Sequence, residues 1–252
     1  MKLKTKIVSV FLITVFLFAI AGVTVSAANN SGITFSVNDS GAVVFACDVN
    51  AEGEVVIPDT YNGKTVTSIA PSAFLNCERI EKIIIPETVN CIGNSAFEGC
   101  LALKEIAIPY GVTSINDSVF SDCISLQKIT LPDSVTSIGG KSFNNAGCYL
   151  EIEMPDSITQ LGEGCFLDSG VSEVTISKNV KVIPKEAFSG CGSLESLVIP
   201  EGIVEIGESA LGGGAYFSTI NIPSTVTKIG KRAFLSLANL ETITVDKNNP
   251  SF

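Results

Sequence analysis

The sequence predicts a β-rich repeat solenoid, in which short coils of similar sequence stack on one another. One apolar position recurs about every 23 residues along most of the chain. Within each repeat, apolar residues recur first every three positions and then every two, which indicates a turn followed by a half-buried strand. The chain is also 46% hydrophobic, so it can form a sizeable core and is not mostly disordered.

The first 27 residues have the pattern of an export signal. Lys2, Lys4 and Lys6 precede an apolar run over residues 7–22, and the small residues of segment 25–27 precede a cleavage point before Ala28. An uncleaved membrane anchor is the alternative, because the apolar run is almost long enough to span a bilayer. We expect cleavage, and therefore a secreted or cell-surface protein that does not insert into the membrane once the signal is removed.

Residues 28–65 precede the regular repeats and are predicted to cap them. Two apolar-rich runs, 33–37 and 42–47, are joined by a turn sequence, and a third run at 54–57 follows another turn. This pattern predicts a β-meander that covers the first coil. The solenoid is then expected over residues 66–252. No second cap is visible, so we expect the array to continue in a longer protein.

The solenoid segment contains eight copies of the pattern V-T-x-I-G-x-x-A-F-x-x-C-x-x-L-x-x-I-x-I-P-x-x. The copies begin at Val66, Val89, Val112, Val135, Ile158, Val180, Ile203 and Val226. The three-residue spacing of Phe97, Cys100 and Leu103 predicts one turn of α- or 3₁₀-helix. The two-residue spacing of Ile106 and Ile108 predicts a short strand. Stacked in register, eight such coils form a parallel sheet.

Glycine recurs at one position of the repeat: Gly93, Gly139, Gly162, Gly207 and Gly230. Pro184 stands at the same position, and proline fixes φ near −65°. A positive φ therefore does not explain this column. We expect close approach of neighbouring backbones instead.

The residue between the two buried strand positions is expected to point outward. This column reads Ile84, Ala107, Thr130, Glu153, Thr175, Val198, Asn221 and Thr244. Solenoids use such a face to hold extended partners, so these residues are the candidate binding surface. A merely solvated sheet is the alternative, although Ile84, Ala107 and Val198 suit solvation poorly.

The next column outward begins with alternating charges, at Lys82, Glu105, Lys128 and Glu151. Neighbouring strands would pair these charges in an exposed ladder worth about 0–1 kcal/mol per pair. Glu151, Glu153 and Glu173 could instead act as paired carboxylates of a glycan hydrolase. Such an enzyme needs a cleft and usually aromatic sugar platforms, so this is a remote alternative.

Four of the eight cysteines share a repeat position: Cys77, Cys100, Cys123 and Cys191. The coil spacing allows a Cys77–Cys100 or a Cys100–Cys123 disulfide. Three stacked thiols cannot all pair, however, and small residues fill the column elsewhere, so we expect unpaired thiols in a buried slot.

The other four cysteines, Cys47, Cys91, Cys148 and Cys165, lie outside this column and lack CxxC spacing. We expect no metal site and no cofactor. Histidine is absent, which excludes Ser-His and Cys-His nucleophile systems, and the net charge of −10 argues against nucleic acid as a partner. We therefore expect no enzymatic activity.

The third repeat shows a family likeness most clearly. Its residues Val112-Thr113-Ser114-Ile115, Val119-Phe120, Cys123, Leu126 and Ile129-Thr130-Leu131-Pro132 resemble the BspA-like (Treponema pallidum type) leucine-rich repeat. The resemblance covers about residues 54–252. It implies a curved leucine-rich-repeat solenoid on a secreted or surface protein, and some members bind host matrix proteins or other cells.

These observations together predict an exported leucine-rich-repeat protein that mediates binding or adhesion through its exposed strand face. The partner is expected to be a protein or another cell-surface ligand, with host and matrix proteins among the candidates. The chain itself is expected to be a monomer. The alternative is a spacer or targeting arm of a larger surface protein whose carboxyl-terminal region carries another role.

Overall fold

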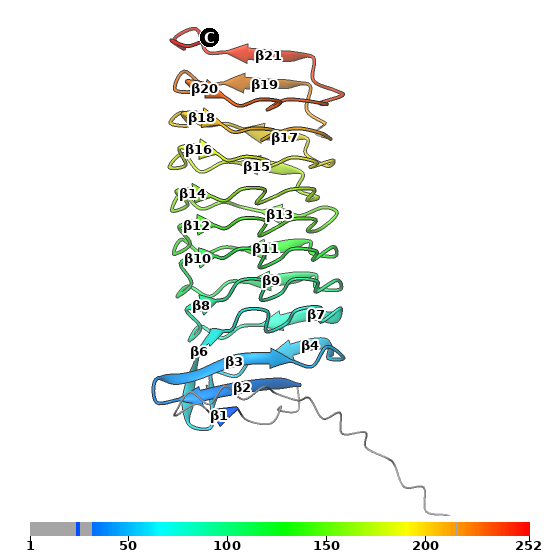
Figure 1. The fold of residues 1–252 in the computed structure, drawn as a ribbon, viewed down its shortest axis with the longest axis vertical. Coiled ribbons are helices and arrows are strands. Elements are labelled where there is room, and N and C mark those ends of the chain that lie inside the picture. Colours follow the sequence, from blue (N-terminus) through cyan, green and yellow to red (C-terminus); the bar gives the residue numbers. More distant parts are fainter. Residues whose placement is uncertain (1–23, 26–31, 215) are drawn as a thin grey trace, which may run out of the picture.

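The computed structural model describes residues 24–25, 32–214 and 216–252, and these form a single stack of coils (Figure 1). The described residues form strands β1 to β21 and contain no helix. Apart from β1 (Thr24–Val25), the predicted signal at residues 1–27 lies outside the described part of the chain. The repeat solenoid predicted from the sequence is confirmed.

One row of strands, here called the main strand row, carries the Ile-x-Ile part of each repeat (Figure 1, right). Its members are β4 (Glu52–Val56), β7 (Arg79–Ile84), β9 (Glu105–Ala107), β11 (Lys128–Thr130), β13 (Glu151–Ile152), β15 (Glu173–Thr175), β17 (Ser196–Val198), β19 (Thr219–Ile222) and β21 (Thr242–Val245). Neighbours pair in parallel with the register that the repeat requires, for example Lys128 with Glu105 and with Glu151. Ladder pairing is interrupted between β13 and β15 and between β17 and β19.

A second row, here called the short strand row, carries the Thr-x-Ile part of each repeat (Figure 1, left). It consists of β6 (Lys64–Ile69), β8 (Cys91–Ile92), β10 (Ser114–Ile115), β12 (Ser137–Ile138), β14 (Gln160–Leu161), β16 (Val182–Ile183), β18 (Glu205–Ile206) and β20 (Lys228–Ile229). Ile115 pairs in parallel with Ile138, and Ile206 pairs with Ile229. The two rows enclose the core, and the segment between them closes each coil.

The closing segment is a run of turns, so the predicted turn of α- or 3₁₀-helix is not confirmed. The Phe74 amide donates to the Ala96 carbonyl of the next coil at 2.8 Å, whereas the following Leu75 amide donates within its own coil to Ser72 at 3.1 Å. Ser72 and Asn76 both have φ of 57°, in the left-handed region. A left-handed residue every fourth position interrupts a right-handed helix, and it turns alternate amides toward the neighbouring coil.

The amino-terminal cap differs in part from the predicted meander. Strands β2 (Ile33–Asn38) and β3 (Gly41–Cys47) form the expected antiparallel hairpin. The third strand does not continue the meander, because β4 pairs in parallel with β7 and so begins the main strand row. Strand β3 pairs in parallel with β6, which in turn pairs antiparallel with the short β5 (Thr60–Tyr61). The cap is therefore a hairpin laid on the first coil.

A column of phenylalanine rings runs through the core. The six members are Phe74, Phe97, Phe120, Phe143, Phe166 and Phe188, and each is at most 1% exposed. Successive ring centroids lie between 5.0 and 5.5 Å apart, and the four pairs after the first are stacked. The side chain of each coil thus contacts the same side chain of its neighbours, as the repeat spacing predicts.

The glycine column is explained by the close approach of coils. A Cβ on Gly162 would lie 2.3 Å from the Gly140 nitrogen, and one on Gly230 would lie 2.4 Å from the Glu208 nitrogen. Neither glycine has a positive φ. The prediction that neighbouring backbones exclude a side chain here is confirmed.

Candidate binding surface

All eight residues of the predicted binding column are exposed, seven of them within the main strand row and Glu153 directly after β13. They are Ile84, Ala107, Thr130, Glu153, Thr175, Val198, Asn221 and Thr244. Strand pairing places them side by side, as Ala107 beside Thr130, Thr175 beside Val198 and Asn221 beside Thr244. The structure therefore brings the column together along the stack. That it binds a partner stays a prediction.

The alternation of burial along each strand holds these side chains outward. In β11, Ile129 is 3% exposed, and the flanking Lys128 and Thr130 are exposed. Two members of the column are large apolar residues in contact with solvent, since Ile84 is 39% and Val198 is 50% exposed. Apolar side chains in the same outward column give this face some surface to bury against a partner.

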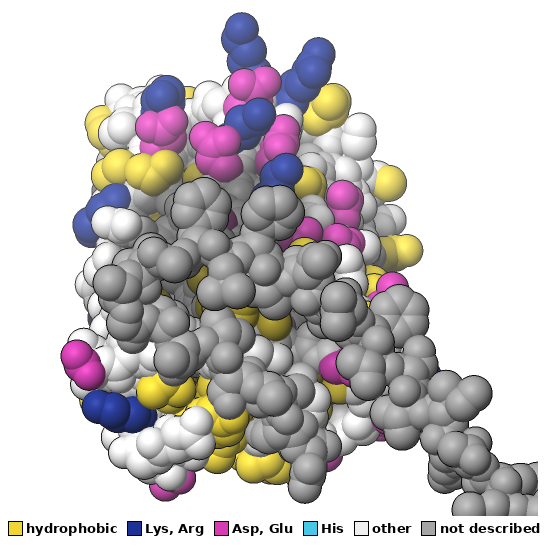
Figure 2. Space-filling view, turned by 60° about the horizontal axis from the view of Figure 1, so that its bottom comes forward, with side chains coloured by type: hydrophobic (Ala, Val, Ile, Leu, Met, Phe, Trp, Pro, Cys, Tyr) yellow, Lys and Arg dark blue, Asp and Glu magenta, His cyan; other side chains and the backbone are white. Residues whose placement is uncertain are grey.

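The charged column beside it forms part of the predicted ladder. The Lys82 ammonium lies 3.2 Å from the Glu105 carboxylate and 3.8 Å from that of Glu54 in the preceding coil. Lys128 lies in register between Glu105 and Glu151, but it makes no ion pair within 4 Å among the described residues. These side chains are about half exposed, so each pair contributes little stability. Figure 2 shows acidic and basic side chains intermixed along one margin of the surface.

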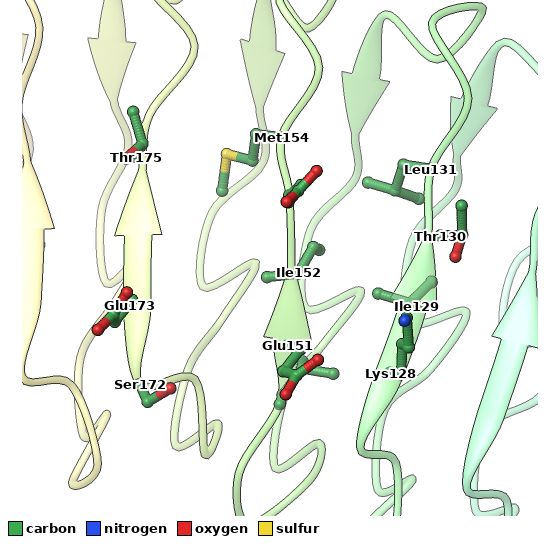
Figure 3. Close-up of a pocket in the computed structure, with 12 residues that line it drawn as sticks. Lys128, Ile129, Thr130, Leu131, Glu151, Ile152, Met154, Ser172, Glu173 and Thr175 are labelled. Atoms are coloured by element: carbon green, nitrogen blue, oxygen red, sulfur yellow. The ribbon is translucent and has the colours of Figure 1, made fainter.

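A hollow on this face lies over β11, β13 and β15 and has a volume of about 1020 Å³ (Figure 3). The strand ladder is interrupted here, and an isolated bridge between Leu150 and Val171 lies where β13 and β15 would otherwise pair. The coil that starts at Ile158 and contains β15 is one residue shorter than its neighbours. We call this hollow the central groove.

The central groove gathers three acidic residues of the sequence analysis. Glu151, Glu153 and Glu173 line it, with Lys128 on one side and Thr130 and Thr175 farther along the strands (Figure 3). The hydrolase hypothesis asks for aromatic sugar platforms beside the carboxylates, and none of the lining residues is aromatic. The groove thus offers polar and acidic contacts, but it lacks the aromatic platforms on which glycan hydrolases usually hold a sugar.

Two exposed tyrosines near this face were missed by sequence reasoning. Tyr149 is 72% exposed and lines a second hollow of about 630 Å³ with Lys82 and Lys128. Tyr216 is 63% exposed and lies at the corresponding edge three coils later, beside Val198. For Tyr149, the sequence contained a signal of this exposure. Tyr149 stands where the repeat places a buried aliphatic residue, and Leu150, 1% exposed, fills that place instead.

The cysteines are unpaired in the structure, and the shared column is a packing feature. The thiols of Cys100, Cys123 and Cys191 donate to the carbonyls of Phe74, Phe97 and Phe166 in the preceding coil, at 3.3, 3.1 and 3.0 Å. Burial raises the pKa of Cys100 and of Cys191 to about 12. Within the described ranges, no three His, Cys, Asp or Glu side chains are placed to hold a metal ion.

Comparison with known proteins identifies the family. The sequence matches the BspA type leucine rich repeat region in six copies, over residues 53–170 and 146–252. The chain belongs to the BspA-type leucine-rich-repeat family. A search of the curated proteins gave no significant match.

Solved structures show the same BspA-type architecture. A leucine-rich repeat protein of T. pallidum is similar, with a TM-score of 0.67 and 24% identity over 85% of this chain and 91% of that one. A leucine-rich repeat protein of Bacteroides ovatus has a TM-score of 0.63 and 29% identity, covering 93% of this chain. The present chain spans only 66% of the B. ovatus protein.

BspA-type proteins are generally surface or secreted proteins that interact with other proteins, and they are typically not enzymes. In the described part of this chain, no helix is long and apolar enough to cross a membrane.

Proposed function

We propose that this BspA-type protein binds an extended segment of a protein or cell-surface partner through its main strand row. The observation that carries the proposal is the exposed column from Ile84 to Thr244, which presents one outward side chain per coil and is in strand register at three of its neighbouring pairs. Parallel strands repeat every ~4.8 Å, so the column offers a regular series of small contacts.

Binding of this kind needs no reactive group. Apolar members such as Ile84 and Val198 would lose contact with water, and threonines such as Thr130 and Thr175 would donate and accept hydrogen bonds. In the middle of the face, Glu151, Glu153 and Glu173 favour a partner segment with basic side chains over an acidic one. Each contact is weak, and affinity arises when several coils are engaged together.

We also propose that residues 1–27 direct export and are removed, which places the strand face outside the cell. Their basic start, apolar run and small-residue ending support this. A mass measurement of the exported protein tests it, since an amino terminus at Ala28 is expected. An intact amino terminus on exported protein would contradict cleavage.

The alternative, a spacer or targeting arm, is favoured by the greater length of the B. ovatus protein. In that case the strand face need not bind anything. The two functions differ in how they respond to changes on that face.

A binding screen with matched variants distinguishes them. The chain would be tested against immobilised extracellular-matrix and cell-surface proteins as wild type, as Thr130→Arg with Thr175→Arg on the main strand row, and as Thr113→Arg with Thr159→Arg directly before strands β10 and β14 of the short strand row. All four threonines are exposed. We expect loss of binding of at least about tenfold only for the first pair, because bulky cations would obstruct the face. Equal binding by all three proteins would contradict the proposal.

A further inference from the structure

Cys77, the member of the cysteine column beside the cap, has different contacts from the other members of the column. Cys100, Cys123 and Cys191 each donate to a phenylalanine carbonyl in the coil before them, at no more than 3.3 Å. Cys77 belongs to the first coil, and the cap hairpin stands where the preceding coil would be. Its sulfur lies 3.7 Å from the Asp48 carbonyl oxygen, the longest of these contacts. Cys77 is thus the column member with the longest hydrogen bond to a backbone carbonyl.

Cys47 fills the space next to it. It is the last residue of β3, and its amide donates to the Ala73 carbonyl of the first coil at 2.7 Å, which holds the end of the hairpin against that coil. Asp48, whose carbonyl oxygen lies 3.7 Å from the Cys77 sulfur, directly follows Cys47, so the Cys47 and Cys77 side chains lie beside each other. A hydrogen bond between the two thiols shifts both of their pKa values. Cys47 is half-buried and Cys77 is buried. One thiol of the pair is therefore within reach of a reagent in solution.

We propose that Cys47 and Cys77 form a disulfide that fastens the cap hairpin to the first coil. The oxidant is a disulfide, carried either by a small thiol compound such as glutathione or by a thiol–disulfide oxidoreductase. The proposal assumes the export set out above, because disulfides persist in oxidising compartments and are rare in the cytosol.

Accessibility gives the two thiols different roles, because Cys47 is half-buried and Cys77 is buried. The hydrogen bond from Cys77 lowers the pKa of Cys47, and the same bond, together with burial, raises the pKa of Cys77. The Cys47 thiolate attacks the oxidant disulfide, forming a mixed disulfide and releasing one thiolate. The Cys77 sulfur then attacks the Cys47 sulfur, and its proton passes to the second departing thiolate. In total the two cysteines are oxidised, and one oxidant disulfide is reduced to two thiols.

The bond would act where a solenoid is least supported. A terminal coil has a neighbour on one side only, so the cap and first coil are held by fewer contacts than the middle of the stack. Closing residues 47–77 into a loop restricts the unfolded chain, which stabilises the folded cap. The loop contains β4, β5 and β6, and β4 is the first strand of the main strand row.

Thiol counting on the full chain tests the bond. The protein would be incubated with oxidised glutathione, denatured without reductant and titrated for free thiols, alongside a sample that was reduced first. The reduced sample should show all eight cysteines. The oxidised sample should show at least two fewer, because the exposed Cys91 and Cys148 also form mixed disulfides with glutathione. Digestion should yield a linked peptide containing Cys47 and Cys77 whose mass is lower by two hydrogens.

Three variants make the result specific. Cys47→Ser and Cys77→Ser should each abolish the linked peptide, whereas Cys91→Ser, at an exposed position, should leave it intact. Reductant should lower the Tm of the oxidised wild type by a few degrees and leave that of Cys47→Ser unchanged. Full retention of thiols, or a Cys77–Cys100 link, would overturn the proposal. None of these readouts depends on partner binding or on location in the cell, so they can fail independently of the proposed function.

Discussion

The rings of Phe143 and Phe166 lie 5.0 Å apart between centroids, and their planes differ by 5°. The two residues are 23 positions apart in the sequence and occupy the same place in consecutive coils. Offset and stacked aromatic pairs at such distances contribute stability beyond the area that they bury. The core is therefore held by contacts between equivalent residues of neighbouring coils.

Removal of one ring from the middle of this column should be costly. We expect Phe143→Ala to lower the free energy of unfolding by about 3–5 kcal/mol, because it leaves a cavity between two rings. Phe143→Leu should cost clearly less, since Leu211 occupies the same column in another coil and is buried. Urea unfolding of both variants checks this. Equal losses would contradict the stacked-column explanation.

The glycine column gives a second prediction. Gly162→Ala should destabilise the protein by about 1–3 kcal/mol, because the new Cβ would lie 2.3 Å from a backbone nitrogen of the preceding coil. Gly140→Ala is the matched control, since its Cβ would have no contact closer than 3.4 Å. Thermal unfolding should show a large decrease in Tm for the first variant and little change for the second. The reverse order would show that backbone approach is not the constraint.

The left-handed positions predict where a substitution by glycine is tolerated best. Glu186 has φ of 57°, and its neighbour Lys185 does not have a positive φ. The two side chains form an ion pair at 3.4 Å, so replacing either residue removes the same contact. Glu186→Gly should therefore be more stable than Lys185→Gly by roughly 1–2 kcal/mol, because glycine relieves the left-handed strain only at the first site. Urea unfolding of the two variants measures the difference directly, and equal stabilities would refute it.

Alkaline pH should expose the cost of ionising a buried column thiol. Burial raises the pKa of Cys100 from 9.0 to about 12. Between these values the unfolded chain loses the proton and the folded chain keeps it, so the contribution of Cys100 to stability is complete below pH 9 and decreases as the pH rises to about 12. We expect the wild type to lose roughly 1 kcal/mol per pH unit relative to Cys100→Ala in this window. Parallel curves for the two proteins would contradict this linkage.

Much of the fold could be predicted from the sequence, because equivalent residues recur at a constant spacing and therefore occupy equivalent places in successive coils. The period gave the strand register, and Pro184 within the glycine column excluded a positive φ there. One column of left-handed positions could not be found in this way, because Ser72, Lys141 and Glu186 do not favour a positive φ, and stacking against the next coil stabilises it. The other column carried a signal that the spacing argument did not use, since it consists mostly of asparagine, aspartate and glycine, as at Asn76 and Gly99. An apolar residue every third position was therefore interpreted as a helical turn.

The candidate surface was predictable to a similar extent. Outward side chains follow from the alternation of a strand, so the column from Ile84 to Thr244 could be named residue by residue. The central groove and Tyr149 depend on irregular coils, where a shift of one residue redirects the chain. Partner strands could not be assigned for Glu52–Val56 either, since a short apolar run does not specify whether it pairs with the preceding hairpin or with a strand one coil later.

Carboxylate footprinting on the complex with a partner tests most directly whether the main strand row is the binding surface. Glu153 and Glu173 are exposed on that face, and Glu163 is exposed in the turn segment of the same coil as Glu173. Labelling with a carbodiimide and an amine, with and without partner, would be quantified at each residue by mass spectrometry. We expect partner binding to reduce labelling of Glu153 and Glu173 severalfold and to leave Glu163 unchanged. Protection of Glu163 alone, with the two strand-face carboxylates still labelled, would contradict binding through the strand face.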